Sequence, residues 1–191
     1  MNSLLTNAYT NLSGGSERER FISIVNRSLA GDYQVKAEAR RSISDFILFS
    51  PQREKLIDTF IRTCVNHTSV HRLDFAIDTL AILDKEFQTF ALSYLDQEMK
   101  QSDLFTGKWH PDHNYWYVLL RALAKCSKKS VSLMIISACQ DEIDPAIGEA
   151  VVEALADMCT VQSTALLTLI ASTHANPLTK QLAQEYLDEC N

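Results

Sequence analysis

Five carboxylates near the end of the chain have a spacing that would gather their charges on one surface. Glu149, Glu153 and Asp157 are each four residues apart, so a helix would carry them on one face. Glu185 lies 32 residues after Glu153, and Glu189 lies 32 residues after Asp157. Repeated like charges cost some helix stability and suit the binding of a basic partner. These five residues are called the acidic ridge, although a solvated outer face would show the same pattern.

A polar connection at residues 101–111 is the second place with groups suited to binding. It contains Trp109 and His110 and leads into a segment with Trp116, so both tryptophans of the chain fall here. Aromatic side chains on a loop are good anchors for a protein partner or a ligand. The same loop could instead fold back so that Trp109 covers a seam between two halves of the protein. The sequence leaves both interpretations open.

Metal and catalytic chemistry find little support in the sequence. His110, Asp112 and His113 are metal-ligand types, but their spacing is too compact for a complete set without distant partners. His67 and His71 are four residues apart, yet Ser69 between them is typical of a helix start. The chain has no glycine-rich phosphate loop, nucleophile elbow, Cys-x-x-Cys pair or His-Glu-x-x-His motif. We therefore expect no catalytic residue, no metal and no cofactor.

The elements that must position these residues form a 32-residue repeat in the second half of the chain. Each copy opens with a short polar residue suited to capping a helix, at Asp112, Asp144 and Asn176. Each copy then carries inward apolar positions and ends on a leucine, at Leu123, Leu155 and Leu187. A period of this length is typical of stacked helical pairs, which bury their apolar faces against their neighbours.

The rest of the chain follows the same pattern of paired helices. A Ser16/Glu19 capping box marks the start of order after a flexible lead-in at residues 1–16. We expect a single all-α domain over residues 17–191, an α-α superhelix (solenoid) with an irregular loop at 101–111. Helical spacing predicts ten helices in five pairs, at about 17–30, 33–49, 51–64, 69–83, 86–101, 112–127, 129–140, 145–159, 161–172 and 177–190.

Composition agrees with a helical protein in the cytoplasm. The 191 residues are 46% apolar and 22% charged, and five glycines and four prolines leave little room for a turn-rich β fold. The start of the chain does not resemble a signal peptide, and no stretch approaches the roughly 20 apolar residues of a membrane span. The cysteines are odd in number and lie among aliphatic residues, which predicts reduced thiols in the core.

The repeated segments resemble a known family. "DPAIGEAVVEAL", from Asp144 to Leu155, looks like the second helix of a short bacterial HEAT-like repeat of the phycobilisome-lyase type, and "NPLTKQLAQEYL", from Asn176 to Leu187, is a looser copy. The family usually has an arginine where this chain has Gly148, so the chain departs at this position from the polar ladder that the family forms between repeats. The resemblance implies an α-α superhelix of about five pairs, used mostly as an armadillo-like scaffold for protein binding.

The distribution of charge favours a protein partner with a basic surface. Residues 1–62 carry a net charge of +2, residues 63–140 are neutral, and residues 141–191 hold one Lys or Arg against nine Asp and Glu. An acidic surface repels phosphates and therefore disfavours nucleic acid. Our hypothesis is a non-enzymatic interaction scaffold, in its most specific version a bacterial immunity protein that neutralises a basic toxin. The alternative is a ligand-binding or lyase-like HEAT-repeat enzyme that uses the aromatic and histidine loop at 104–116.

Overall fold

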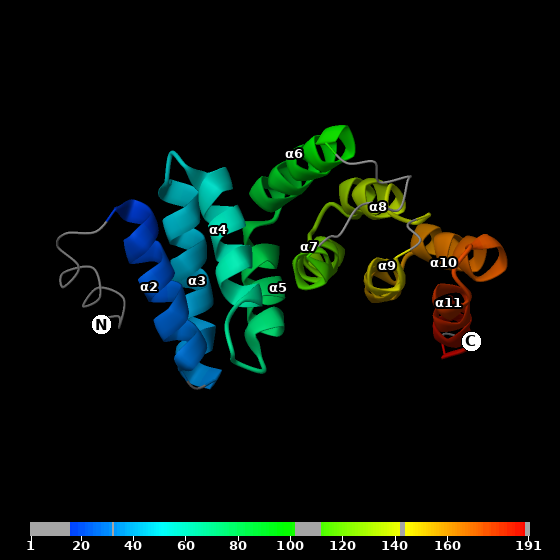
Figure 1. Cartoon of the computed structure of the whole chain (residues 1–191), viewed down its shortest axis with the longest axis horizontal. Coiled ribbons are helices and arrows are strands. Elements are labelled where there is room, and N and C mark those ends of the chain that lie inside the picture. The colour runs from blue at the N-terminus through cyan, green and yellow to red at the C-terminus, as the bar shows by residue number, and fades with distance from the viewer. Residues whose placement is uncertain (1–15, 32, 102–111, 142–143, 190–191) are drawn as a thin grey trace. The chain divides into compact units, whose positions relative to one another are not determined.

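The protein is built from α-helices (Figure 1). The computed structural model describes residues 16–31, 33–101, 112–141 and 144–189, and within these ranges ten α-helices and no strand occur. The chain divides into two compact units between Leu83 and Asp84. The prediction of an all-α fold is confirmed, and the interruption predicted at 101–111 falls inside the second unit, with residues 102–111 outside the described ranges.

In its described residues, the first unit contains four helices that pack as two layers. Their bounds are α2 (Glu17–Ala30), α3 (Tyr33–Phe49), α4 (Arg53–Val65) and α5 (Arg72–Leu83). Helix α2 packs against α4, and α3 packs against α5. Phe60 is central to the core, because its ring centroid lies 6.4 Å from that of Phe21 and 6.1 Å from that of Phe75. The Ser16/Glu19 capping box forms as predicted and starts α2.

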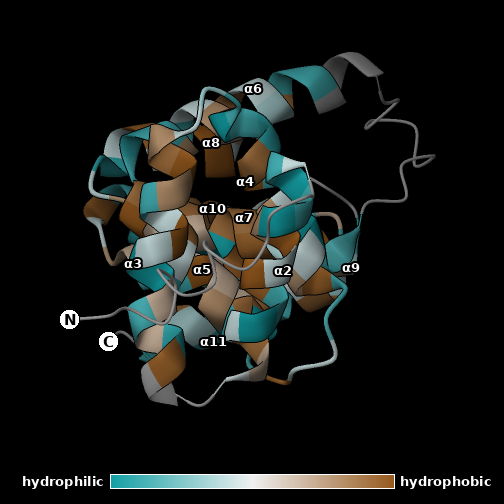
Figure 2. Cartoon of the chain, turned by 90° about the vertical axis from the view of Figure 1, so that its left-hand side faces the viewer, coloured by the Kyte–Doolittle hydropathy of each residue, from teal (hydrophilic) through white to brown (hydrophobic). Residues whose placement is uncertain are grey.

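The second unit contains six helices within the ranges that the structure describes, and those that occupy the same place in successive copies of the repeat are neighbours. Their bounds are α6 (Lys85–Gln101), α7 (His113–Lys125), α8 (Lys129–Ser137), α9 (Pro145–Met158), α10 (Val161–Thr173) and α11 (Pro177–Glu189). Helix α7 packs against α9, and α9 packs against α11 (Figure 1). Helix α8 contacts both α7 and α9, and α10 contacts both α9 and α11. Hydrophobic and hydrophilic residues share the helices, as amphipathic packing requires (Figure 2).

The caps and apolar positions of the repeat are in place. Asp112 accepts a hydrogen bond from the backbone N–H of Tyr115, and Asp144 accepts bonds from the second and third residues of α9. Asn176 does the same at the start of α11. The inward apolar residues of α7 and α9 are buried; they are Val118, Leu119, Ala122 and Leu123 on α7 and Ala150, Val151, Ala154 and Leu155 on α9. Of their equivalents on α11, Ala183 is buried, whereas Leu182, Tyr186 and Leu187 are half-buried. The helix of the last copy is therefore less deeply buried than its two predecessors.

Two predicted helix starts in the first unit are too early. Helix α4 begins at Arg53, because residues 51 and 52 form a turn. Helix α5 begins at Arg72 and not near Ser69, because the Ser69 backbone N–H binds the ring of His67. The Arg72 guanidinium closes the same turn by donating to the carbonyl of Val65 at 3.3 Å. Serine is common both in turns and at helix caps, and Ser69 belongs to a turn.

Three of the cysteines are buried as predicted. Burial raises the pKa of the Cys64 thiol, and burial together with the nearby Asp84 carboxylate raises the pKa of Cys126 to about 12. Cys139 is also buried, but the prediction was wrong for Cys159, which is exposed at the end of α9 with a left-handed φ of 47°. Cys190 lies outside the described residues. Among the described helices, none has the length and apolar content needed to cross a membrane.

Candidate acidic binding site

Helices α9 and α11 carry the acidic ridge. Glu149 and Asp157 are exposed on α9, and Glu185 and Glu189 are exposed on α11. Glu153 is half-buried between its two neighbours on α9. Because α9 packs against α11, the five carboxylates belong to two adjacent helices, as the spacing of the repeat predicts.

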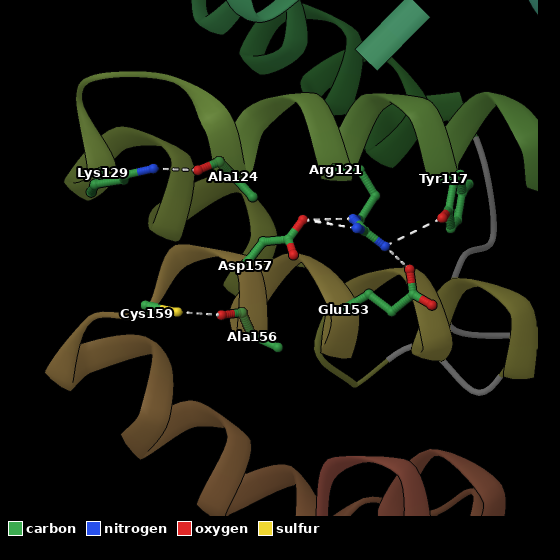
Figure 3. A network of polar contacts seen from close by, with 8 residues as sticks. All are labelled: Tyr117, Arg121, Ala124, Lys129, Glu153, Ala156, Asp157 and Cys159. Carbon is green, nitrogen blue, oxygen red and sulfur yellow. Dashed lines mark hydrogen bonds and ion pairs between the residues drawn. The ribbon is translucent and has the colours of Figure 1, made fainter. Parts of the chain in front are cut away.

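A single arginine from α7 binds two carboxylates of the ridge (Figure 3). The Arg121 guanidinium forms an ion pair with Glu153 and a second ion pair with Asp157, whose Oδ2 lies 2.9 Å from Nη2. Nη1 of Arg121 also donates to the Tyr117 hydroxyl at 3.2 Å, and the guanidinium carbon lies 5.5 Å from the centre of that ring. Arg121 is therefore held on several sides and fixes the position of two ridge carboxylates.

The contact with Arg121 leaves the ridge strongly negative. One positive charge faces Glu153 and Asp157, so this group of three keeps a net charge of −1. Within the described ranges, Glu149, Glu185 and Glu189 form no ion pair with a lysine or arginine. Glu185 instead accepts a hydrogen bond from the Gln181 side-chain amide at 2.8 Å. The exposed carboxylates can thus attract a cation from outside the chain.

Sequence reasoning missed Arg121, although the repeat contained the signal. Arg121 lies one repeat before Glu153, which lies one repeat before Glu185, so all three occupy the same position in successive copies. On α7 that position is basic and binds the acidic residues of the next helix. On α9 the same position is acidic and lies next to another acidic helix. The structure therefore puts a polar link between α7 and α9 at this position, and not at the position of Gly148.

Gly148 has a packing role between α9 and α11. A Cβ atom added to Gly148 would lie 2.4 Å from Oγ1 and 2.9 Å from Cγ2 of Thr179, which is itself buried on α11. Both distances are too short for real contacts, so only glycine permits this approach. The residue that departs from the HEAT-like pattern thus lets α11 pack closely on α9.

The two tryptophans of the second predicted site differ in what the structure describes: Trp116 is buried in a helix, and Trp109 lies outside the described residues. Trp116 is 2% exposed and Tyr115 is 1% exposed, and both lie against Tyr94 of α6, at ring-centroid distances of 5.8 and 5.0 Å. This burial contradicts the proposed role of Trp116 as a surface anchor, because apolar packing between α6 and α7 takes its whole side chain. Trp109 and His110 lie outside the described residues.

The histidines considered as metal ligands have other contacts. His113 places Nε2 3.1 Å from Oδ2 of Asp144, the residue that caps α9, and Asp112 caps α7. His67 accepts a backbone hydrogen bond through Nδ1. In the part of the chain that the structure describes, no three His, Cys, Asp or Glu side chains form a group that could hold a metal ion.

Comparison with known proteins assigns no family to this arrangement. No family model, curated protein or solved structure matches the chain. The candidate site therefore rests on the geometry of α7, α9 and α11.

Proposed function

We propose that the chain is a non-enzymatic interaction module that binds a basic region of another protein through the acidic ridge. The supporting observation is the contrast within the ridge itself. Arg121 binds Glu153 and Asp157, while Glu149, Glu185 and Glu189 stay exposed and form no ion pair with a lysine or arginine among the described residues. A partner that brings lysine or arginine to these three carboxylates would relieve their mutual repulsion and associate faster at low ionic strength.

The proposal includes the architecture that the HEAT-like resemblance implies. In the first unit α2 packs on α4 and α3 on α5, and in the second unit α7, α9 and α11 pack in succession. This pattern within each unit supports one α-α superhelix of five helical pairs. Such a scaffold would present the ridge as part of an extended surface.

The most specific version of the proposal is a bacterial immunity protein that neutralises a cationic toxin. Its support is the acidic end of the chain, where nine Asp and Glu stand against one Lys among residues 141–191. The lyase-like alternative depended on the loop at 104–116. Its aromatic anchor Trp116 is buried, and no described residue favours it.

The proposal is tested with a triple variant that neutralises the exposed carboxylates without disturbing Arg121. Glu149→Gln, Glu185→Gln and Glu189→Gln remove three charges from the ridge. A matched control, Glu38→Gln, Asp45→Asn and Glu54→Gln, removes three charges from exposed positions of the first unit. Immobilised wild type, ridge variant and control are exposed to cell extract at low and at high salt, and the captured proteins are identified.

We expect basic proteins to bind wild type and the control at low salt and to be lost at high salt. The ridge variant should lose them at both salt concentrations, with a drop of about tenfold or more in the amount captured. Capture of the same proteins by all three forms would remove the ridge from consideration as the binding surface.

A further inference from the structure

A polar groove runs along the junction of α2 and α4, in the unit that does not carry the acidic ridge. Its volume is about 330 Å³, at the lower end of the range for pockets that hold small ligands. Arg18, Ile22 and Asn26 line it from α2, Arg62 lines it from α4, and Asn66 lines it just after the end of α4. The groove was not anticipated from the sequence, because its residues come from two helices that are separated along the chain by the whole of α3.

The packing of the first unit explains why these residues meet. Ser50, just before α4, donates a hydrogen bond to Glu17 at the start of α2 at 3.1 Å, so the two helices begin at the same end. Phe21 of α2 also packs on Phe60 of α4 in the core. Positions four residues apart lie above one another on a helix, so each helix presents a short row of side chains to the groove.

The lining of the groove is rich in hydrogen-bond donors and contains no carboxylate. Asp58 lies beside it and is engaged, because both of its oxygens lie 3.0 Å from Nε of Arg62. This contact fixes the position of the Arg62 guanidinium. His67 also lines the groove, and its Nδ1 accepts the backbone N–H of Ser69 at 3.0 Å. Because Nδ1 accepts this bond, Nε2 is the ring nitrogen that can donate a hydrogen bond to a ligand.

We infer that this groove is a binding site for a small ligand that carries an oxyanion, either a phosphate or a carboxylate. The guanidinium groups of Arg18 and Arg62 supply the forked donors that such groups prefer, and with Asp58 paired to Arg62 these three side chains keep a net charge of +1. The side-chain amides of Asn26 and Asn66 and the ring of His67 add donors around them. The lining has no phenylalanine, tyrosine or tryptophan ring for stacking and no carboxylate to bind a cation, so an oxyanion matches it best.

The inference is tested by titrating the full-length chain, labelled with ¹⁵N, with inorganic phosphate and separately with succinate. Saturable shifts are expected in the backbone signals of α2 and α4 and in the arginine Nε signals. Arg18→Gln should weaken binding about tenfold, because a charged hydrogen-bond donor is lost. Arg27→Gln is the matched control, since Arg27 is exposed on the same helix and does not line the groove.

Each result of the titration decides something. Binding of phosphate alone, succinate alone or both supports the site and states which oxyanion it takes, provided that Arg18→Gln weakens it and Arg27→Gln does not. Arg62→Gln is a second lining variant, whose fold is checked by circular dichroism. Saturation by neither anion, or equal weakening by the control, overturns the inference. The ridge variant should bind these anions normally, so this result is independent of the proposed function.

Discussion

The junction of α7 with α9 and the junction of α9 with α11 are built from the same repeat, yet they differ in packing and in charge. At the first junction the inward residues of both helices are buried, and Arg121 links the helices through Glu153 and Asp157. At the second, α11 leaves most of its inward residues half-buried, and no arginine occupies the corresponding position. The repeat thus determines which helices are neighbours, while single residues determine how strongly they are joined.

The largest expected effect is a difference in stability between variants of equivalent leucines at the two junctions. Leu155 of α9 is completely buried, and its equivalent Leu187 of α11 is half-buried. Leu155→Ala should lower the free energy of unfolding by about 2–5 kcal/mol, because it opens a cavity in the core. Leu187→Ala should cost about 1 kcal/mol, because water already reaches that site. Urea unfolding followed by tryptophan fluorescence measures both, since both tryptophans belong to the second unit. Equal costs would mean that the two junctions are packed alike.

The repeat made the helices and their caps predictable from the sequence. Asp112, Asp144 and Asn176 cap their helices because a short polar side chain before a helix has one favourable use, to bind the free N–H groups. The burial of Trp116 was not predictable in this way. Its exposure depends on Tyr94, which lies on another helix and packs against it.

The candidate site was predicted in part for a similar reason. The spacing of Glu153, Asp157 and Glu185 placed the ridge on adjacent helices. The spacing could not show which carboxylates were already paired, because that depends on the reach of the Arg121 side chain from α7. A contact between helices is decided by side-chain length and direction, which a periodic pattern does not record.

The next effect tests the close approach of α9 and α11. Gly148→Ala gains up to about 1 kcal/mol of helix propensity but forces its methyl group into Thr179, so we expect a net loss of about 1–2 kcal/mol in the free energy of unfolding. Thr179→Ala removes the two atoms that clash and a buried hydroxyl that has no hydrogen-bond partner. In the Thr179→Ala background, Gly148→Ala should cost less than half as much. Additive costs in this double-mutant cycle would show that the contact does not hold α11 in place.

The smallest expected effect on stability comes from removing Arg121, the cation that links α7 to α9 and has no equivalent between α9 and α11. Arg121→Gln removes a cation that is 21% exposed and faces two carboxylates, so unfolding should become easier by about 1 kcal/mol, and by less at high salt. Lys85→Gln, at an exposed position of the same unit, is the charge-matched control and should change stability little. The same substitution of Arg121 should strengthen binding of a basic partner at low salt, because Glu153 and Asp157 lose their internal cation. A stable Arg121→Gln protein that binds its partner more weakly would mean that Arg121 itself contacts the partner, and that the ridge does not act as a purely acidic surface.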